Sequence, residues 1–247
     1  MDYAKVAVER GLGEIGFADH NPMPEYFDSW RMLREDLPRY VESVQEARAA
    51  YPQLNIKLGL ECDFIPGHER WIERLSGMVQ WDYLIGSVHY LPQGWEVDNP
   101  AYVGRHHGHA DEIWDAYWRR FAECARSGLF DFVAHPDLPK KFGTVPKGDL
   151  RLYYEHGIEA LVETDTPFEI NTAGWRKECA EQYPSQEFLR MAQSAGLELL
   201  INSDAHMPSE VGAAFEPAAN LACAVGFTHT LRYTRRQRSR VPLAPPA

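Results

Sequence analysis

Leu60-Glu-Cys-Asp63 ends an apolar run with residues that can bind a metal ion, and four other segments end in the same way. These are Phe17-Ala-Asp-His20, Gly86-Ser-Val-His89, Ala134-His-Pro-Asp137 and Ile201-Asn-Ser-Asp-Ala-His206. Short apolar runs bounded by turn residues are typical of buried parallel strands. Histidines and carboxylates that follow several such strands predict one shared site at the carboxyl ends of the strands.

Helical patterns alternate with these strands along the chain. The expected strands are 14–19, 56–61, 83–89, 130–135, 168–171 and 197–202, with 228–233 a possible seventh; the expected helices are 40–50, 69–78, 111–127, 150–162 and 185–195. Alternation with short connections predicts parallel strands joined by helical crossovers, so an open doubly wound sheet or a closed barrel would fit. Ligand residues after five different strands favour the α/β barrel, because an open sheet concentrates its site where the strand order reverses.

Length and composition predict a single globular domain. The chain has 247 residues, of which 45% are hydrophobic, and we expect one domain over 1–247 with a frayed tail from about 235. The basic run Arg235-Arg-Gln-Arg-Ser-Arg240 is better explained as an exposed final strand with solvated side chains than as a binding patch. A formal net charge of −11 argues against a nucleic-acid partner. With no long apolar run and no signal-like start, we predict a cytoplasmic protein that does not bind membranes.

Two other groups of potential ligands favour a plain interpretation. The four cysteines are far apart and show no C-x-x-C spacing, so they predict neither disulfides nor a zinc-thiolate site. The irregular stretch 91–110 contains Arg105-His-His-Gly-His109. Because this loop lacks carboxylates at ligand spacing, we expect it to cover the mouth of the barrel rather than to bind a metal.

Six residues at strand ends are candidate ligands for divalent Zn, Mn or Fe. Imidazole nitrogens and carboxylate oxygens bind these ions, and a carboxylate can bridge two of them. Any one of the histidines alone is better explained as a polar residue at a strand end whose hydrogen-bonding groups have partners. Together they favour a metal site, because each buried polar group without a partner costs about 1–3 kcal/mol. The candidates are His20, Glu61, His89, His135, Asp204 and His206, with Glu61 and Asp204 as possible bridges.

The motifs around these residues resemble those of histidinol-phosphate phosphatases, in the polymerase and histidinol phosphatase (PHP) superfamily. The resemblance rests on Gly16-Phe-Ala-Asp-His-Asn-Pro-Met-Pro24, Gly59-Leu-Glu-Cys-Asp-Phe64, Ile85-Gly-Ser-Val-His-Tyr90, His135-Pro-Asp-Leu-Pro-Lys-Lys-Phe142, Glu169-Ile-Asn-Thr-Ala-Gly174 and Asn202-Ser-Asp-Ala-His206. It implies a distorted (β/α)7 barrel with up to three metal ions that hydrolyses L-histidinol phosphate in histidine biosynthesis. It also implies that Glu61, His89 and His135 hold one ion, that Glu61 and Asp204 bridge to a second, and that His20 and His206 serve the third.

The resemblance fails at the start of the chain. Family members open with a strand that ends in a His-x-His pair, followed by another histidine, and these residues complete two of the metal sites. The present chain has none of the three, and residues 3–11 form an amphipathic helical pattern with no strand before it. We therefore expect the first barrel strand to be missing, and we expect the metal sites that it completes in the family to bind metal more weakly in this chain.

The resemblance also suggests catalytic and substrate-binding residues. Asp19 could orient His20 or move a proton to the departing alkoxide, and support of the ligand is the commoner role for such a residue. Asp204 would act in catalysis as a bridging carboxylate. The guanidinium of Arg176 suits the binding of a phosphate, although from sequence alone Arg176 is equally well explained as a solvated cation in a loop. The candidate substrate-binding residues are Asn171, Arg176, Lys177 and Lys141, with Lys140 a weaker candidate.

Two alternative functions remain open from the sequence. The chain could be a PHP phosphoesterase that acts on another small phosphoester, or a metal-binding domain with weakened catalysis. A panel of substrates separates the first alternative from a histidinol-phosphate phosphatase. Measurements of metal content and turnover separate the second alternative, a metal-binding domain with weakened catalysis, from an active phosphatase.

Overall fold

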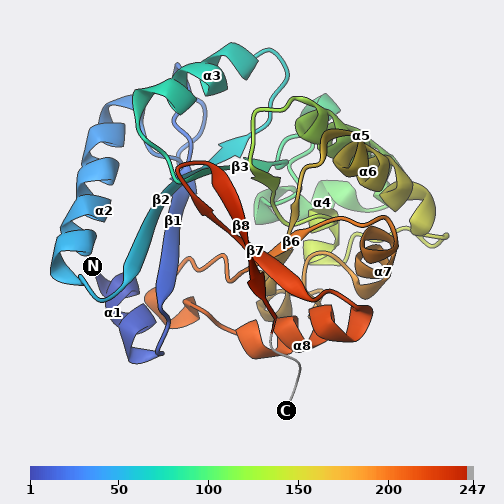
Figure 1. Ribbon diagram of the computed structural model, residues 1–247. Coiled ribbons are helices and arrows are strands. Elements are labelled where there is room, and N and C mark those ends of the chain that lie inside the picture. Colours follow the sequence, from blue (N-terminus) through green and yellow to red (C-terminus); the bar gives the residue numbers. More distant parts are fainter. Residues whose placement is uncertain (244–247) are drawn as a thin grey trace.

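A computed structural model describes residues 1–243 of this protein. Six parallel strands form one sheet whose spatial order, β1-β2-β3-β4-β5-β6, is also the order in the sequence. Figure 1 shows this sheet curving into a half-barrel. The strands are β1 (Glu14–His20), β2 (Asn55–Asp63), β3 (Tyr83–Ser87), β4 (Phe132–Val133), β5 (Phe168–Asn171) and β6 (Leu199–Asn202). The predicted α/β class with repeated βα units is confirmed.

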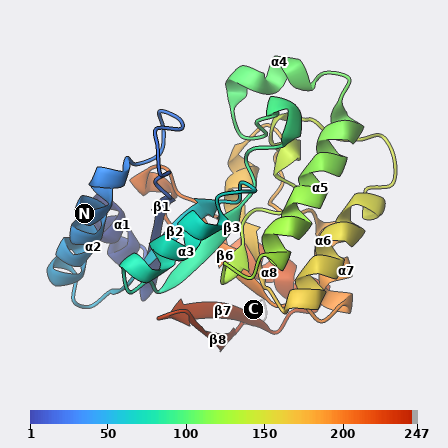
Figure 2. The ribbon, with the colours of Figure 1, turned by 90° about the horizontal axis from the view of Figure 1, so that it is seen from above.

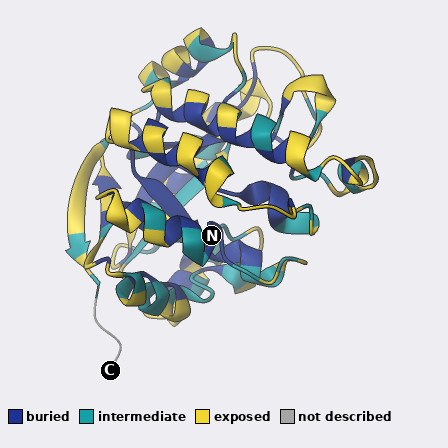
Figure 3. Ribbon diagram, turned by 90° about the vertical axis from the view of Figure 1, so that its right-hand side faces the viewer, coloured by how far each residue is buried: buried dark blue, intermediate teal, exposed yellow. Residues whose placement is uncertain are grey.

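The helices pack around the sheet, each with a buried side toward the interior and an exposed side toward solvent, as Figure 3 shows. The longest, α5, buries one apolar stripe that includes Trp114, Tyr117 and Trp118, each fully buried. No helix in residues 1–243 has the length and apolar character needed to cross a membrane. The helices are α1 (Asp2–Glu9), α2 (Leu37–Ala50), α3 (Glu69–Met78), α4 (Val103–His106), α5 (Ala110–Arg126), α6 (Arg151–Thr164), α7 (Gln186–Ser194) and α8 (Phe215–Val225).

The segment predicted as a possible seventh strand is a strand, but it does not join the parallel sheet. β7 (His229–Thr234) pairs in antiparallel register with β8 (Gln237–Pro242). Leu231 and Tyr233 of this hairpin pack with Phe132 in an apolar cluster, and the Tyr233 hydroxyl donates to the carbonyl of Asp131, just before β4 (2.7 Å). The hairpin therefore lies across the amino-terminal ends of the parallel strands, where Figure 2 shows it below the sheet.

The expectation of a frayed tail from residue 235 is wrong for the residues that form β8. Backbone pairing with β7 orders this segment, and ion pairs hold its basic side chains. Arg236 pairs with Asp131 at 2.9 Å, and Arg238 and Arg240 both pair with Glu198. The side chains are largely exposed, as predicted for a final strand. The part of the expected tail at 244–247 lies outside the described residues.

A cavity of about 560 Å³ opens between β1 and β6, the two end strands of the sheet. Its lining runs from Leu12 near the amino-terminal ends of the strands to His20 at their carboxyl ends. Helix α1 spans the two sides, because the Arg10 guanidinium, just after this helix, donates to the carbonyls of Val211 (2.6 Å) and Ser209 (2.8 Å) beyond β6. The opening gives the carboxyl ends of the strands access to solvent.

Candidate metal centre

The parallel register brings the predicted ligands to one edge of the sheet. His20 ends β1 and is the register partner of Glu61 on β2. His89 and His135 each lie two residues beyond the end of β3 and β4, the next strands in the sheet. Four of the six predicted metal ligands therefore meet at the carboxyl ends of neighbouring strands.

Glu61, His89 and His135 form a buried cluster of potential ligand atoms. Glu61 Oε1 lies 3.1 Å from His135 Nε2 and 3.8 Å from His89 Nε2. All three residues are buried, and their potential ligand atoms lie within 4.8 Å of one another. Two imidazoles and a carboxylate at this spacing suit a divalent Zn, Mn or Fe ion.

A second group of three consists of His20, Asp63 and His89. Asp63 Oδ1 lies 2.7 Å from His89 Nδ1, and Asp63 Oδ2 lies 3.9 Å from His20 Nδ1. Because Asp63 holds one nitrogen of His89, the other nitrogen is directed toward Glu61. A carboxylate on the far nitrogen of a ligand histidine fixes the orientation of the ring and increases its basicity.

The sequence analysis placed Asp63 in a segment that ends in metal-binding residue types but did not include it among the six candidate ligands. The signal was present, because side chains two residues apart on a strand point to the same face, and Glu61 and Asp63 are two apart on β2. This spacing places the Asp63 carboxylate on the same face of β2 as Glu61.

The charges in this pocket favour a cation. Burial alone would raise the pKa of the Glu61 carboxyl, but His20 and His135 hold that pKa well below its usual range. Burial disfavours the charged form of His89, but Asp63 and Glu61 raise its pKa to about 9. In addition, His20 Nδ1 and His135 Nδ1 are buried and have no hydrogen-bond partner among residues 1–243. Carboxylates that attract protons onto neighbouring imidazoles provide the potential in which a divalent ion can replace those protons, so the residues present fit a metal.

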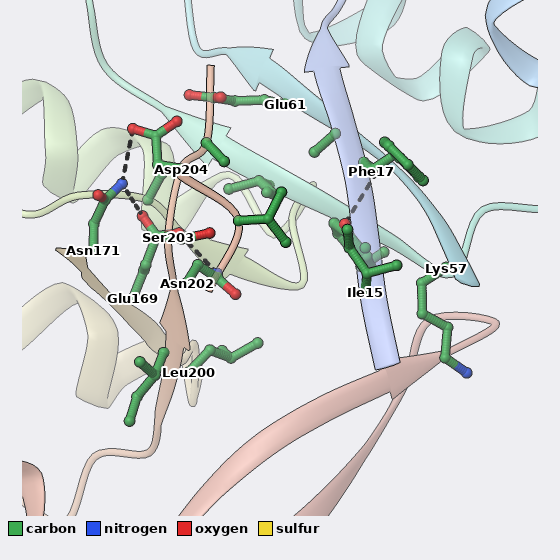
Figure 4. Close-up of a pocket in the computed structure, with 18 of the residues that line it drawn as sticks. Ile15, Phe17, Lys57, Glu61, Glu169, Asn171, Leu200, Asn202, Ser203 and Asp204 are labelled. Atoms are coloured by element: carbon green, nitrogen blue, oxygen red, sulfur yellow. Dashed lines mark hydrogen bonds between the residues drawn. The ribbon is translucent and has the colours of Figure 1, made fainter. Parts of the chain in front are cut away.

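Asp204 and His206 lie on the other side of the cavity, after β6. Figure 4 shows Glu61, on β2, and Asp204, in the segment after β6, projecting into the same cavity. The Asn171 amide donates to Asp204 Oδ2 at 3.1 Å, while the His206 side chain is 66% exposed. Within residues 1–243, neither belongs to a group of three potential ligands within 4.8 Å.

Glu169 on β5 is a functional candidate that the sequence analysis missed. Its Oε2 accepts from the backbone N–H of His135 (2.9 Å), and its Oε1 accepts from the Asn202 amide (2.7 Å). Burial raises the pKa of Glu169, and Asp204 raises it further. This carboxylate links the segment that carries His135 to β6. The available signal was a charged residue inside the apolar run 168–171.

The predicted anion-binding residues differ in how far they are already engaged. The Arg176 guanidinium donates to the carbonyls of Ser203 (2.8 Å) and Asp204 (3.3 Å), and it pairs with Glu210 at 3.3 Å. Lys177 is exposed. Lys141 forms an ion pair with Asp98, and Lys140 is buried in pairs with Asp137 and Glu181.

Two further predicted features have simple local contacts. Asp19 is exposed, and its Oδ1 accepts from the backbone N–H of His20 at 2.9 Å. In the loop 91–110, His106 and His109 pack beside Trp95, with ring centroids 5.9 and 5.2 Å away. Neither histidine joins a potential metal group among the residues that the structure describes.

Comparison with known families agrees with this arrangement of motifs. The PHP domain family matches residues 1–173, a stretch that includes His20, Glu61, His89 and His135. The chain belongs to the PHP domain family. The part of this PHP protein beyond the match contains the segment after β6 with Asp204 and His206.

Similar proteins cover nearly all of the PHP protein. A probable histidinol-phosphatase of Deinococcus radiodurans is 40% identical over 240 residues, which are 96% of this chain and 91% of the relative. A histidinol-phosphatase of Bacillus subtilis is 26% identical over 87% of this chain and 89% of its own length. The crystal structure of a Lactococcus lactis histidinol phosphate phosphatase, complexed with zinc, L-histidinol and phosphate, superposes with a TM-score of 0.76 at 20% identity, covering 96% and 91% of the two chains. The last match supports the fold.

Proposed function

We propose that this PHP protein is a metal-dependent phosphomonoesterase that hydrolyses L-histidinol phosphate to L-histidinol and phosphate in histidine biosynthesis. The observation that carries the proposal is the buried cluster of Glu61, His89 and His135, with ligand atoms within 4.8 Å, in a chain 40% identical to a probable histidinol-phosphatase. Divalent ions in such a cluster lower the pKa of water and neutralise charge on a phosphate ester.

The proposed roles of the residues combine the family resemblance with the clusters described above. Glu61, His89 and His135 hold the ion that is bound most tightly, and Asp63 orients His89. Asp204, with Glu61, would hold a second ion, and His20 and His206 would hold a third, so the complete site would take up to three Zn, Mn or Fe ions. Asp19 supports His20 or moves a proton. We also propose that residues 1–247 fold as one domain.

Of the proposed phosphate-binding residues, Asn171 lines the cavity. Asn171 already donates to Asp204, and Arg176 contacts the carbonyls of the same segment. We propose that Arg176, with Asn171, Lys177 and Lys141, binds the phosphate. Lys141 would have to exchange its ion pair with Asp98 for the substrate.

A substrate panel tests the proposed activity. Purified protein loaded with Mn²⁺, Zn²⁺ or Fe²⁺ should hydrolyse L-histidinol phosphate with kcat/KM at least about tenfold above that for p-nitrophenyl phosphate, which corresponds to about 1.4 kcal/mol of transition-state binding. Chelation should abolish both activities, and added metal should restore them. Equal rates on the two substrates would overturn the substrate assignment in favour of a less selective phosphoesterase.

One observation favours the alternative of a weakened metal-binding domain. Asp204 and His206 lie outside the groups of closely spaced ligands in the described residues. If the protein binds metal stoichiometrically but hydrolyses none of the phosphomonoesters, this alternative replaces the proposed activity.

A further inference from the structure

Trp30 is a large, partly exposed aromatic residue beside the metal cluster. It lies in the segment between β1 and α2 and lines the cavity together with His20 and Glu61. Its ring centroid is 4.4 Å from that of His20 in an edge-to-face contact, and 6.2 Å from that of His89. Even so, Trp30 remains 44% exposed. An exposed indole within contact distance of ligand histidines forms a wall of the mouth of the site.

A buried ionic network fixes the position of this wall. The neighbouring Arg31 is 6% exposed, and it donates to Asp63 (3.0 Å) and to Asp28 (2.8 Å). Its guanidinium carbon lies 4.8 Å from the centroid of the Trp30 ring. Because Asp63 also holds His89, the Trp30 segment and a metal ligand share one carboxylate. The indole is therefore prearranged relative to the metal cluster.

A second aromatic side chain, in the segment after β3, supports the indole. Tyr90, next to His89, is nearly parallel to Trp30, with an interplanar angle of 5° and centroids 6.2 Å apart. The Tyr90 hydroxyl donates to Asp28 at 2.7 Å, the same carboxylate that pairs with Arg31. Two rings attached to one ionic network make a rigid apolar surface, and such a surface loses little conformational entropy when it binds a ligand.

We infer that Trp30 is a specificity-determining residue that packs against the ring end of the substrate. The inference rests on the proposed function. When the phosphate lies at the metal cluster, the imidazole of L-histidinol phosphate is at the opposite end of the molecule and must lie toward the mouth. An indole face attracts aromatic rings by stacking and attracts a protonated imidazole through its quadrupole. Trp30 thus selects phosphomonoesters that carry a ring at this distance.

Two substrates that differ only in the ring test the inference. L-alaninol phosphate has the same amine and phosphate as L-histidinol phosphate but lacks the imidazole. Trp30→Ala should lower kcat/KM for L-histidinol phosphate about tenfold and change that for L-alaninol phosphate by less than about twofold, with metal content unchanged. Trp30→Phe should keep most of the preference. Tyr26→Ala is the matched control, because Tyr26 belongs to the same segment, is 75% exposed and does not line this cavity.

The outcomes separate this inference from the proposed function. If wild type prefers L-histidinol phosphate but Trp30→Ala retains that preference, or loses activity equally on both substrates, the role of Trp30 is overturned while the function stands. If the wild-type protein does not prefer L-histidinol phosphate over p-nitrophenyl phosphate, the proposed function itself is overturned. If Trp30→Ala loses metal, the same measurement is made with Trp30→Leu. A ratio of kcat/KM for L-histidinol phosphate to that for L-alaninol phosphate that equals the wild-type ratio in this variant overturns the inference.

Discussion

The two sides of the candidate site differ in how firmly the protein holds them. The side chains of Glu61, His89 and His135 are 12%, 6% and 5% exposed, and Glu61 contacts both histidines. Across the cavity, the side chains of Asp204 and His206 are 28% and 66% exposed. Both sets lie at or just after the carboxyl ends of strands of the same sheet, yet only the first forms a closely spaced cluster in the described residues.

The position of each strand in the sheet explains this difference. β2, β3 and β4 have a paired strand on both sides, whereas β6 is at the end of the sheet. Side chains after central strands are surrounded by neighbouring segments, so they are desolvated and fixed. Those after an end strand face the opening between β1 and β6, which leaves them in contact with solvent. The comparison predicts one ion held tightly by the buried cluster and weaker binding on the exposed side.

The largest expected effect is the loss of Glu61. Glu61→Ala should reduce kcat/KM by about a thousandfold or more and remove the tightly bound metal. Loss of a residue that only orients a metal ligand typically lowers metal affinity or activity about tenfold to hundredfold, and loss of a ligand itself should cost more. Metal analysis by mass spectrometry and steady-state kinetics measure both effects. Glu42→Ala on the exposed surface of α2 is the control. Retention of metal by Glu61→Ala would contradict the central role of the cluster.

Asp63 tests whether the buried side depends on support of its ligands. Asp63→Asn keeps the size of the side chain but removes the charge that faces His89, so metal affinity should fall about tenfold to hundredfold. Metal-competition titrations with a chelator measure this affinity. Asp28→Asn is a close control, because Asp28 also pairs with Arg31 but does not contact His89. Equal losses in the two variants would assign the effect to Arg31.

Arg176 tests the role of the exposed side in binding substrate. Arg176→Ala should raise KM for L-histidinol phosphate about tenfold and leave metal content intact, as expected for a group that binds phosphate in both ground and transition states. Exposed Arg190 on α7 serves as the control position. Because Arg176 also donates to the carbonyls of Ser203 and Asp204, loss of metal in this variant would show that it braces the Asp204 segment instead.

His206 should give the smallest effect. His206→Ala should leave the affinity of the tightly bound ion within about threefold of wild type and lower kcat/KM by less than about tenfold, since the side chain is largely exposed and contacts mainly its own segment. A stepwise metal titration monitored by isothermal calorimetry distinguishes the tight site in the buried cluster from weaker sites on the exposed side. Complete loss of tightly bound metal would show that the two sides act as one unit.

The sequence located most strands and the buried ligands because both depend on local patterns. β5 has the predicted bounds, and β1, β2 and β6 begin or end within two residues of prediction. β4 is shorter than predicted, with only Phe132 and Val133 in the ladder. The backbone of His135 has φ of 27°, which is incompatible with continued strand pairing and directs the imidazole toward Glu61.

The place of the antiparallel hairpin in the fold could not be predicted from its own residues. The apolar alternation of 228–233 fits a strand of the parallel sheet as well as a strand of a hairpin, and the position of the hairpin against the sheet depends on contacts with segments distant in sequence. The Arg236 backbone donates to the carbonyl of Asp82 at 2.9 Å, and Tyr233 packs on Phe132 with centroids 5.7 Å apart. These contacts require the whole sheet to be in place.

The sequence alone determined the βα repetition, the residue types at the strand ends and therefore the edge of the sheet at which His20, Glu61, His89 and His135 meet. Tertiary structure alone decided that Asp63 holds His89 and that Glu169 ties the His135 backbone to β6. It also decided that Asp204 and His206 face an open cavity. The physical reason is that strand periodicity is a property of neighbouring residues, whereas burial and the pairing of charges depend on which distant segments exclude water from a side chain.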